Sequence, residues 1–103
     1  MQVIFFNKKT ERFFESLEIL LRSRADSSIQ LLKKHGNNLE MPHSKPLGKG
    51  LFELRVIGMI HIRFIYTFYL DNIWILHGFI KKTNKISKAD MGYAQKQLKM
   101  LLQ

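Results

Sequence analysis

Apolar residues in the first third of the chain recur at helical spacing. Residues 3–6 form a short apolar run that predicts a first strand. Thr10 offers a helix N-cap, and a stripe at intervals of three and four follows it: Phe13, Leu17, Leu20 and Leu21. This stripe predicts an amphipathic helix over residues 10–23. Asp26 or Ser27 can cap a second helix, which Gly36 and the asparagines after it would end. The two helices would form a helical hairpin.

From residue 51 onward the hydrophobic period is about two. A loop over residues 39–50, which holds both prolines, precedes this region. Strands are predicted over residues 51–57, 60–69 and 73–81, with turns at Gly58-Met59 and Asp71-Asn72. Ser87 can cap a last helix, with Asp90 completing a variant of the capping box. The order β-α-α-β-β-β-α predicts a single α+β domain over residues 1–103, in which helices cover one face of an antiparallel sheet.

Strand parity predicts where the charges lie, because successive residues of a strand point to opposite faces. With turns centred on Gly58 and Asp71, one face collects Glu53, Arg55, His61, Arg63, His77 and Lys81. The other face carries Phe64, Tyr66, Trp74, Leu76 and Ile80 for the helices. A two-residue turn at Asp71-Asn72 would instead exchange the faces of the third strand. The first register is favoured because the second places Trp74, Leu76 and Ile80 on the polar face. Gly78, beside His77, has no side chain that would obstruct the close approach of another molecule.

The charge balance points to an anionic partner. Lys and Arg number 17 against eight Asp and Glu, which gives a net charge of +9. A protein this basic usually meets nucleic acid, an anionic membrane surface or an acidic protein, although a merely soluble basic surface is the simpler explanation. Charged and polar residues interrupt the apolar region over residues 60–80, which therefore predicts no membrane span. No secretory signal is visible, and the absence of cysteine fits a reducing compartment, so we expect a cytoplasmic protein.

The basic face has two interpretations. Arginines held by a rigid sheet can bind phosphate through paired hydrogen bonds, and Lys82 and Lys85 would extend such a surface past the third strand. Lys49, in the loop with the prolines, is expected to border it. Alternatively, the face carries only cross-strand ion pairs such as Glu53–Arg63. The four histidines lack metal-ligand spacing, and the sequence predicts neither a metal site nor a cofactor.

Three stretches together resemble a known family. They are "KPLGKGLFELR" (residues 45–55), "IRFIYTF" (62–68) and "ILHGFIKKTNKIS" (75–87), and a helix with Ala94 follows them. In this order and spacing they resemble the HigB-like branch of the RelE/ParE superfamily, the toxins of type II toxin–antitoxin pairs. The resemblance implies a RelE-like fold and a small ribonuclease that cuts mRNA without a metal, typically on the ribosome. It also implies a HigA-like helix-turn-helix antitoxin as the partner.

The resemblance assigns roles to particular residues. Arg63 matches an arginine of the family's strand motif, Arg55 ends the "ELR" strand, and Lys81 and Lys82 match basic residues after the third strand. RNA cleavage without a metal requires a base for the 2′-hydroxyl, charge stabilisation at phosphorus and an acid for the 5′-oxygen. Fixed cations can stabilise the charge, and a histidine, Glu53 or a lysine can move the protons.

The predicted sites follow from these roles. The predicted catalytic set is Arg55, His61, Arg63, His77 and Lys81, and the predicted RNA-binding set is Lys49, Lys82 and Lys85. Two other functions stay open at this point. One is a ParE-like toxin that targets gyrase, and the other is a non-catalytic RNA- or protein-binding module.

Overall fold

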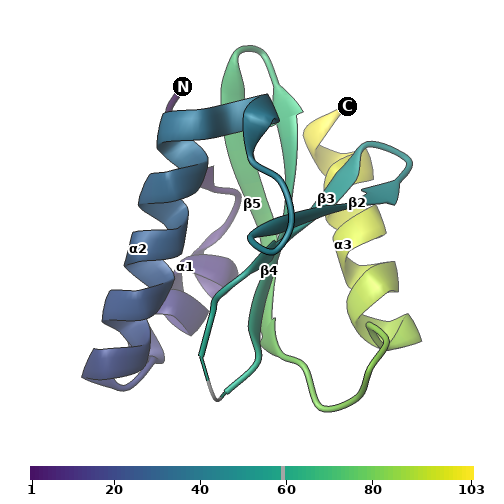
Figure 1. The fold of residues 1–103 in the computed structure, drawn as a ribbon. Coiled ribbons are helices and arrows are strands. Elements are labelled where there is room, and N and C mark those ends of the chain that lie inside the picture. The colour runs from purple at the N-terminus through teal and green to yellow at the C-terminus, as the bar shows by residue number, and fades with distance from the viewer. Residues whose placement is uncertain (59) are drawn as a thin grey trace.

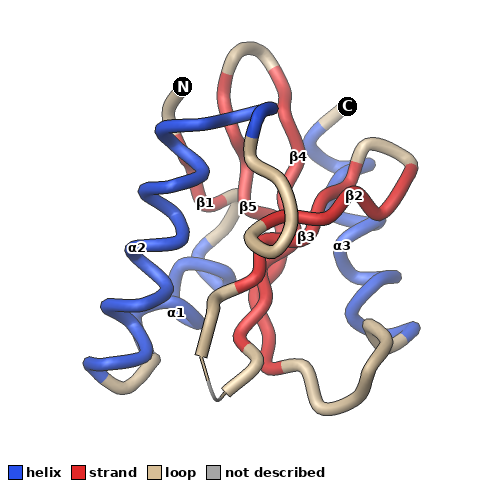
Figure 2. The backbone as a smooth tube through the Cα atoms, in the orientation of Figure 1, coloured by secondary structure: helices blue, strands red, loops and turns tan. Residues whose placement is uncertain are grey.

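A five-stranded sheet forms the centre of the fold, with strands in the order β1-β5-β4-β3-β2 (Figure 1). The structure, a computed structural model, describes residues 1–58 and 60–103, so the predicted turn residue Met59 lies outside the described part. The strands are β1 (Val3–Phe5), β2 (Ser44–Gly48), β3 (Leu51–Arg55), β4 (Ile62–Tyr69) and β5 (Asn72–Ile80). The helices are α1 (Lys8–Ser16), α2 (Ile19–His35), the short 3-10 turn Gly36–Asn38 and α3 (Lys88–Leu101) (Figure 2). Only β1 runs parallel to its neighbour, β5; the other pairs are antiparallel.

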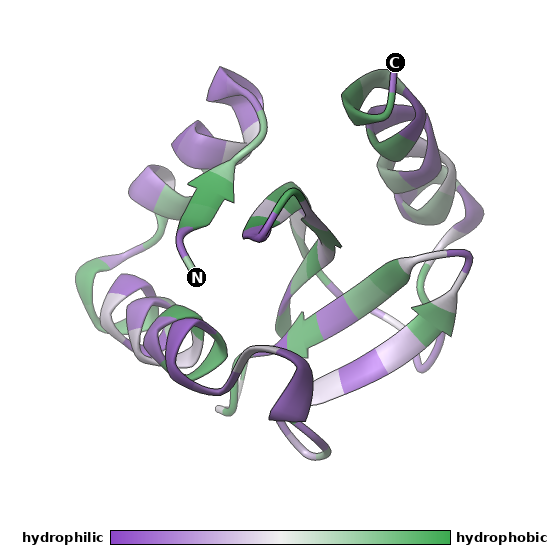
Figure 3. Cartoon of the chain, turned by 90° about the horizontal axis from the view of Figure 1, so that it is seen from above, coloured by the Kyte–Doolittle hydropathy of each residue, from purple (hydrophilic) through white to green (hydrophobic). Residues whose placement is uncertain are grey.

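The helices lie on both faces of this sheet. The α+β class and the element types are confirmed, but the expectation that all helices cover one face is wrong. Seen from above, the sheet stands between the α1/α2 pair and α3 (Figure 3). A large core lies under α1 and α2, and a second core lies under α3, with Leu51, Ile65, Leu76, Phe79 and Ala94 at its centre. The face of the sheet under α3 is therefore apolar where the helix covers it. It is polar only beyond the end of α3.

The boundary between the first two helices lies closer to the N-terminus than predicted. Asn7, not Thr10, caps α1, because its side chain accepts a hydrogen bond from the Thr10 N–H at 2.9 Å. Leu17 adopts an extended backbone conformation that ends α1, and Glu18 caps α2 with its own carboxylate. The predicted second cap, at residue 26 or 27, lies inside α2. Leu17, at the break between α1 and α2, is still buried in the core. The apolar spacing in the sequence therefore continues across the break and predicted a single helix.

Strand β2 was predicted as loop. It is an edge strand that pairs with β3 and contains a proline, which an edge strand tolerates. Between β3 and β4, the predicted register is two residues off: Arg55 lies opposite Arg63, not His61. An error of two residues preserves parity, so the predicted grouping of faces on these strands is unaffected.

A β-bulge reconciles the two registers considered for β4 and β5. At the site end, Arg63 lies opposite Phe79 and Ile65 opposite His77, as predicted. Beyond Ile65 the register shifts by one, and a tight turn joins Tyr69 to Asn72. At the hairpin end the strands therefore have the parity of the alternative, but the two turn residues are Leu70 and Asp71, not Asp71 and Asn72. As a result, Trp74 and Leu76 pack under α3, whereas they were predicted to share the face of Phe64 and Tyr66, which lies under α1 and α2. Ile80, also predicted for the helix-covered face, is largely exposed.

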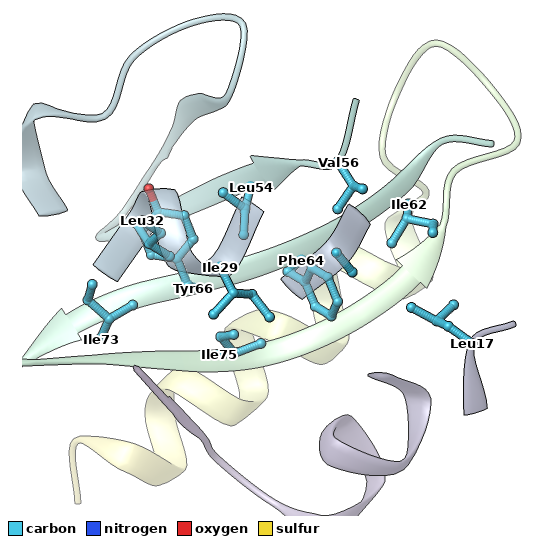
Figure 4. Packing of buried hydrophobic residues seen from close by; sticks show 11 residues of the cluster. Leu17, Ile29, Leu32, Leu54, Val56, Ile62, Phe64, Tyr66, Ile73 and Ile75 are labelled. Atoms are coloured by element: carbon cyan, nitrogen blue, oxygen red, sulfur yellow. The ribbon is translucent and has the colours of Figure 1, made fainter. Parts of the chain in front are cut away.

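The larger core explains Gly78, which was expected to leave the surface beside His77 open to a close approach. Figure 4 shows the side chains of this core, including Phe64, between the sheet and the α1/α2 pair (Figure 4). A Cβ at Gly78 would come within 2.5 Å of Phe13 Cδ2 and 2.9 Å of Phe64 Cε1. The glycine is therefore required for aromatic packing on the face opposite His77.

Candidate active site

A buried carboxylate, Glu53, organises the basic end of the sheet. It lies on β3 and is 1% exposed. Its Oε1 accepts a hydrogen bond from Arg55 Nε at 2.9 Å. Its Oε2 lies 3.8 Å from Arg63 Nε on β4 and 3.7 Å from Lys81 Nζ just past β5. Three strands thus bring three cations to one carboxylate, in the region where β4 begins and β5 ends (Figure 1).

These three cations are largely buried, but their charges are only partly balanced by Glu53. The exposed fractions of the Arg55, Arg63 and Lys81 side chains are 21%, 11% and 12%. In the described part of the chain, Glu53 Oε2 and Arg63 Nε are buried without a hydrogen-bond partner, since 3.8 Å is too long for such a bond. One carboxylate beside three cations leaves a positive surplus, and buried polar atoms without partners favour a bound ligand.

Arg63 is the most constrained of the three cations. Its NH1 group donates to the Ile62 carbonyl at 3.0 Å, and its NH2 group lies 3.4 Å from His61 Nδ1. Burial lowers the pKa of Arg63, the Glu53 carboxylate raises it in part, and the Arg55 charge lowers it. The guanidinium nevertheless stays charged, because an arginine pKa starts far above neutrality. Arg63 is therefore a fixed cation whose charge is poorly solvated, which strengthens its attraction for an anion.

A cleft of about 210 Å³ opens beside this cluster. Among the described residues that line it there is no carboxylate; they are His61, Arg63, Lys81, Lys82, Thr83 and Asn84. His61 directly precedes β4, Arg63 lies near its start, and the others come from the loop that leads from β5 to α3. A small hollow with a cationic wall and hydroxyl and amide groups can hold a phosphate group.

His77 does not join the cluster, contrary to prediction. Its Nε2 lies 2.8 Å from Asp90 Oδ1 on α3, and its ring packs against Phe79 and Tyr93. The parity prediction for His77 was right, but the face was expected to be open, whereas α3 covers this part of it. His77 therefore fixes α3 to β5.

The predicted lysines divide into two groups. Lys82 lines the 210 Å³ cleft, and Lys85 lines an adjoining cleft. Lys49 lies in the turn between β2 and β3, at the opposite end of β3 from Arg55, where it borders a hollow with Leu98 and Lys99 of α3. The expectation that Lys49 borders the basic cluster is therefore wrong.

Sequence reasoning missed part of the site. Glu53 was considered for proton transfer, but its place as the shared partner of three cations depends on register. Thr83, Asn84 and Asp90 were missed altogether as lining residues, since loop and helix-start residues carry no periodic signal. The only hint was the polar run "KKTNK" directly after a buried strand.

The chain matches one family model, described as phage derived protein Gp49-like, over residues 12–99. The protein belongs to the Gp49-like family. This family lies within the clan of RelE/HigB-like toxin families, so the resemblance seen in the sequence is confirmed at that level. The narrower HigB assignment stays a prediction. No curated protein matches the chain. In the part of the chain that the structure describes, no helix of this Gp49-like protein is long and apolar enough to cross a membrane.

Proposed function

We propose that this Gp49-like protein is the toxin of a toxin–antitoxin pair and that it cleaves mRNA on the ribosome without a metal. The single observation that carries the proposal is the set of three cations around the buried Glu53, which borders a phosphate-sized cleft. Membership of a family in the RelE/HigB-like clan supports it. The high net positive charge also supports a polyanionic substrate.

The proposed mechanism uses this chain's own side chains. The scissile phosphate occupies the cleft beside Arg63 and Lys81. The 2′-oxygen loses its proton and attacks phosphorus, and the bond from phosphorus to the 5′-oxygen breaks as that oxygen gains a proton. The products are a 2′,3′-cyclic phosphate and a 5′-hydroxyl. Arg63 and Lys81 stabilise the charge that develops on the phosphoryl oxygens, and because they are already fixed, they need little reorganisation.

Proton transfer is assigned to the side chains that reach the cleft. His61 lines the cleft, whereas His77 is engaged with Asp90. We therefore assign His61 to one of the two proton transfers. Glu53 and Arg55 act as positioning residues, because their contact holds the carboxylate that orients Arg63 and Lys81.

The decisive experiment is cleavage of ribosome-bound mRNA by the purified protein, with the 3′ ends mapped. Mg²⁺ stays in the buffer because the ribosome requires it, so the metal-free step is tested on its product: the new 3′ ends should carry 2′,3′-cyclic phosphates. Arg63→Ala should lower the rate by about 100- to 1,000-fold, the usual cost of removing one preorganised charge-stabilising group. Lys49→Ala is the matched control, since this lysine lies away from the cluster and its loss should leave the rate within about threefold of wild type. Equal rates for Arg63→Ala and wild type would contradict the mechanism, and gyrase inhibition with intact mRNA would favour a ParE-like activity.

The proposal also includes an antitoxin. A family within this toxin clan suggests such a partner, and the charge of this chain suggests that the partner presents an acidic segment. Opposite charges would steer the two proteins together and speed association. Co-expression with each neighbouring open reading frame, followed by affinity purification, should yield a stable complex and restore growth. Recovery of the free protein alone, with growth still inhibited, would count against an antitoxin encoded nearby.

A further inference from the structure

A second cleft, of about 330 Å³, adjoins the phosphate-sized one and shares Lys81, Lys82 and Thr83 with it. Ligand pockets usually start at about 300 Å³. The first cleft lies below this size and suits a single phosphate group, whereas the second has room for a larger chemical group. A ligand that fills both would therefore have a phosphate joined to a bulkier part, as a nucleotide does.

The lining of the second cleft combines apolar, cationic and acidic groups. Ile80 lines the cleft and is 45% exposed, whereas Phe79 is 7% exposed and packs mainly in the core under α3, so Ile80 supplies most of the apolar surface. Lys82 and Lys85 supply positive charge. In the part of the chain that the structure describes, Asp90 is the carboxylate in this lining. An unstacked base can be held by apolar side chains and read by a hydrogen-bonding group beside them.

Asp90 is held in a fixed orientation. Its Oδ1 lies 2.8 Å from His77 Nε2, and its Oδ2 accepts a hydrogen bond from Ser87 Oγ at 2.8 Å. Burial alone would raise the pKa of Asp90, but the hydrogen bonds from His77 and Ser87 and the charge of His77 outweigh burial and hold it below its ordinary value. The group is thus an ionised acceptor at neutral pH. A carboxylate has about four acceptor positions, so about two are left for a ligand.

We propose that the second cleft binds the base of a nucleotide next to the scissile phosphate and that Asp90 selects guanine there. This inference rests on the proposed ribonuclease function and adds its base preference. Single-stranded RNA is read at the Watson–Crick edges of its bases. The guanine edge presents two adjacent donors, N1–H and N2–H, which match a carboxylate. Adenine and cytosine each present one amino donor beside an acceptor nitrogen, and uracil presents one N–H between two carbonyl oxygens that a carboxylate repels.

The first test maps cleavage sites on ribosome-bound mRNAs whose codons are randomised. Guanine should be enriched about tenfold or more over uracil at one position beside the cut, since one paired contact usually discriminates by five- to 150-fold. Asp90→Asn should remove this enrichment, because the amide replaces one acceptor by a donor. Asp26→Asn, the same change at an exposed position of α2, is the matched control and should keep the guanine preference.

A second experiment measures base preference from binding alone, without a cleavage step. Fluorescence anisotropy compares labelled pentaribonucleotides that differ only in one central base. The wild-type protein should bind the guanine form about tenfold more tightly than the uracil form, and Asp90→Asn should bind both alike. Ile80→Ser, an exposed change that leaves the fold intact, should weaken all forms to a similar extent. Circular dichroism checks that each variant is folded.

The outcomes separate this inference from the ribonuclease proposal. Cleavage without a guanine preference, or with a preference that Asp90→Asn retains, overturns the role of Asp90 and leaves the ribonuclease proposal standing. Guanine-selective binding without any cleavage supports the base site and overturns the ribonuclease proposal. Equal affinity for all four bases in the binding assay overturns the base site, whatever the cleavage assay shows.

Discussion

Replacement of Glu53 by glutamine tests the centre of the site, because it removes one negative charge and almost no volume. The amide oxygen can still accept a hydrogen bond from Arg55 Nε, which lies 2.9 Å from Oε1 in the wild-type protein. The amide nitrogen, however, would face Arg63 and Lys81, which now contact Oε2 at 3.8 and 3.7 Å. A donor would thus point toward two cations.

The expected cost follows from burial. Breaking a buried ion pair by removing one partner typically costs 3–5 kcal/mol, because it leaves an uncompensated charge. Glu53 is 1% exposed, but its partners are 11–21% exposed and can reach water in part. We therefore expect the lower end of that range, about 3 kcal/mol. In a domain of this size each kcal/mol lowers Tm by about 4–8 °C, which gives a decrease of about 12–24 °C.

Urea unfolding followed by the fluorescence of Trp74 measures the free energy of unfolding, and thermal unfolding followed by circular dichroism measures Tm. Glu11→Gln is the matched control, since the contact between Glu11 and Lys8 spans 3.9 Å and both side chains are well exposed. That change should alter stability by less than about 0.5 kcal/mol. If Glu53→Gln is as mild as Glu11→Gln, the buried charge cluster does not have the energetic role inferred from its geometry.

Three further predictions concern other parts of the molecule. Gly78→Ala should destabilise the fold by about 1–3 kcal/mol in urea unfolding, because its Cβ would lie 2.5 Å from Phe13 Cδ2. Gly92→Ala, with nothing within 4 Å, should stabilise it by up to about 1 kcal/mol. Asp90 has a lowered pKa in the fold, so its stabilising effect is full above the ordinary value of about 3.9 and is lost as the pH falls below it. Unfolding between pH 2 and 5 should therefore show a shallower loss of stability for Asp90→Asn than for wild type, and equal slopes would contradict the shift. Lys82→Ala should weaken RNA binding and reduce the slope of log affinity against log salt by about one, whereas Lys49→Ala should change neither in an anisotropy titration.

The sequence alone was sufficient to find the cations of the site. Arg55, Arg63 and Lys81 share a face because strand parity has a period of two, and the register error of two residues between β3 and β4 left that parity intact. Ser87 was recognised as the cap of α3 from its own spacing to Asp90, and the structure confirms the hydrogen bond from the Asp90 N–H. Local and periodic signals were reliable because they survive small errors in element boundaries.

Other features were not accessible from the pattern. The bulge between Ile65 and Tyr66 puts Trp74 and Leu76 under α3, and no single residue marks it in the sequence. The side of the sheet on which α3 packs depends on this change of parity. Once α3 lies there, it covers His77, so the prediction for His77 failed through packing between elements distant in the sequence.

The basic face can contain structural ion pairs and still bind phosphate, because its positive charges outnumber its negative one. The contact predicted between Glu53 and Arg63 is present, but the same carboxylate also contacts Arg55 and Lys81. Three positive charges and one negative charge leave a surplus of two. Without Glu53 the cations would repel one another and turn toward water, and with a second carboxylate the surplus would be largely cancelled. A surplus of two exceeds the single charge of a phosphodiester and matches the two negative charges of the five-coordinate species that the proposed cleavage would form. The cluster is therefore expected to bind that species more strongly than the substrate, which is the condition for accelerating the reaction.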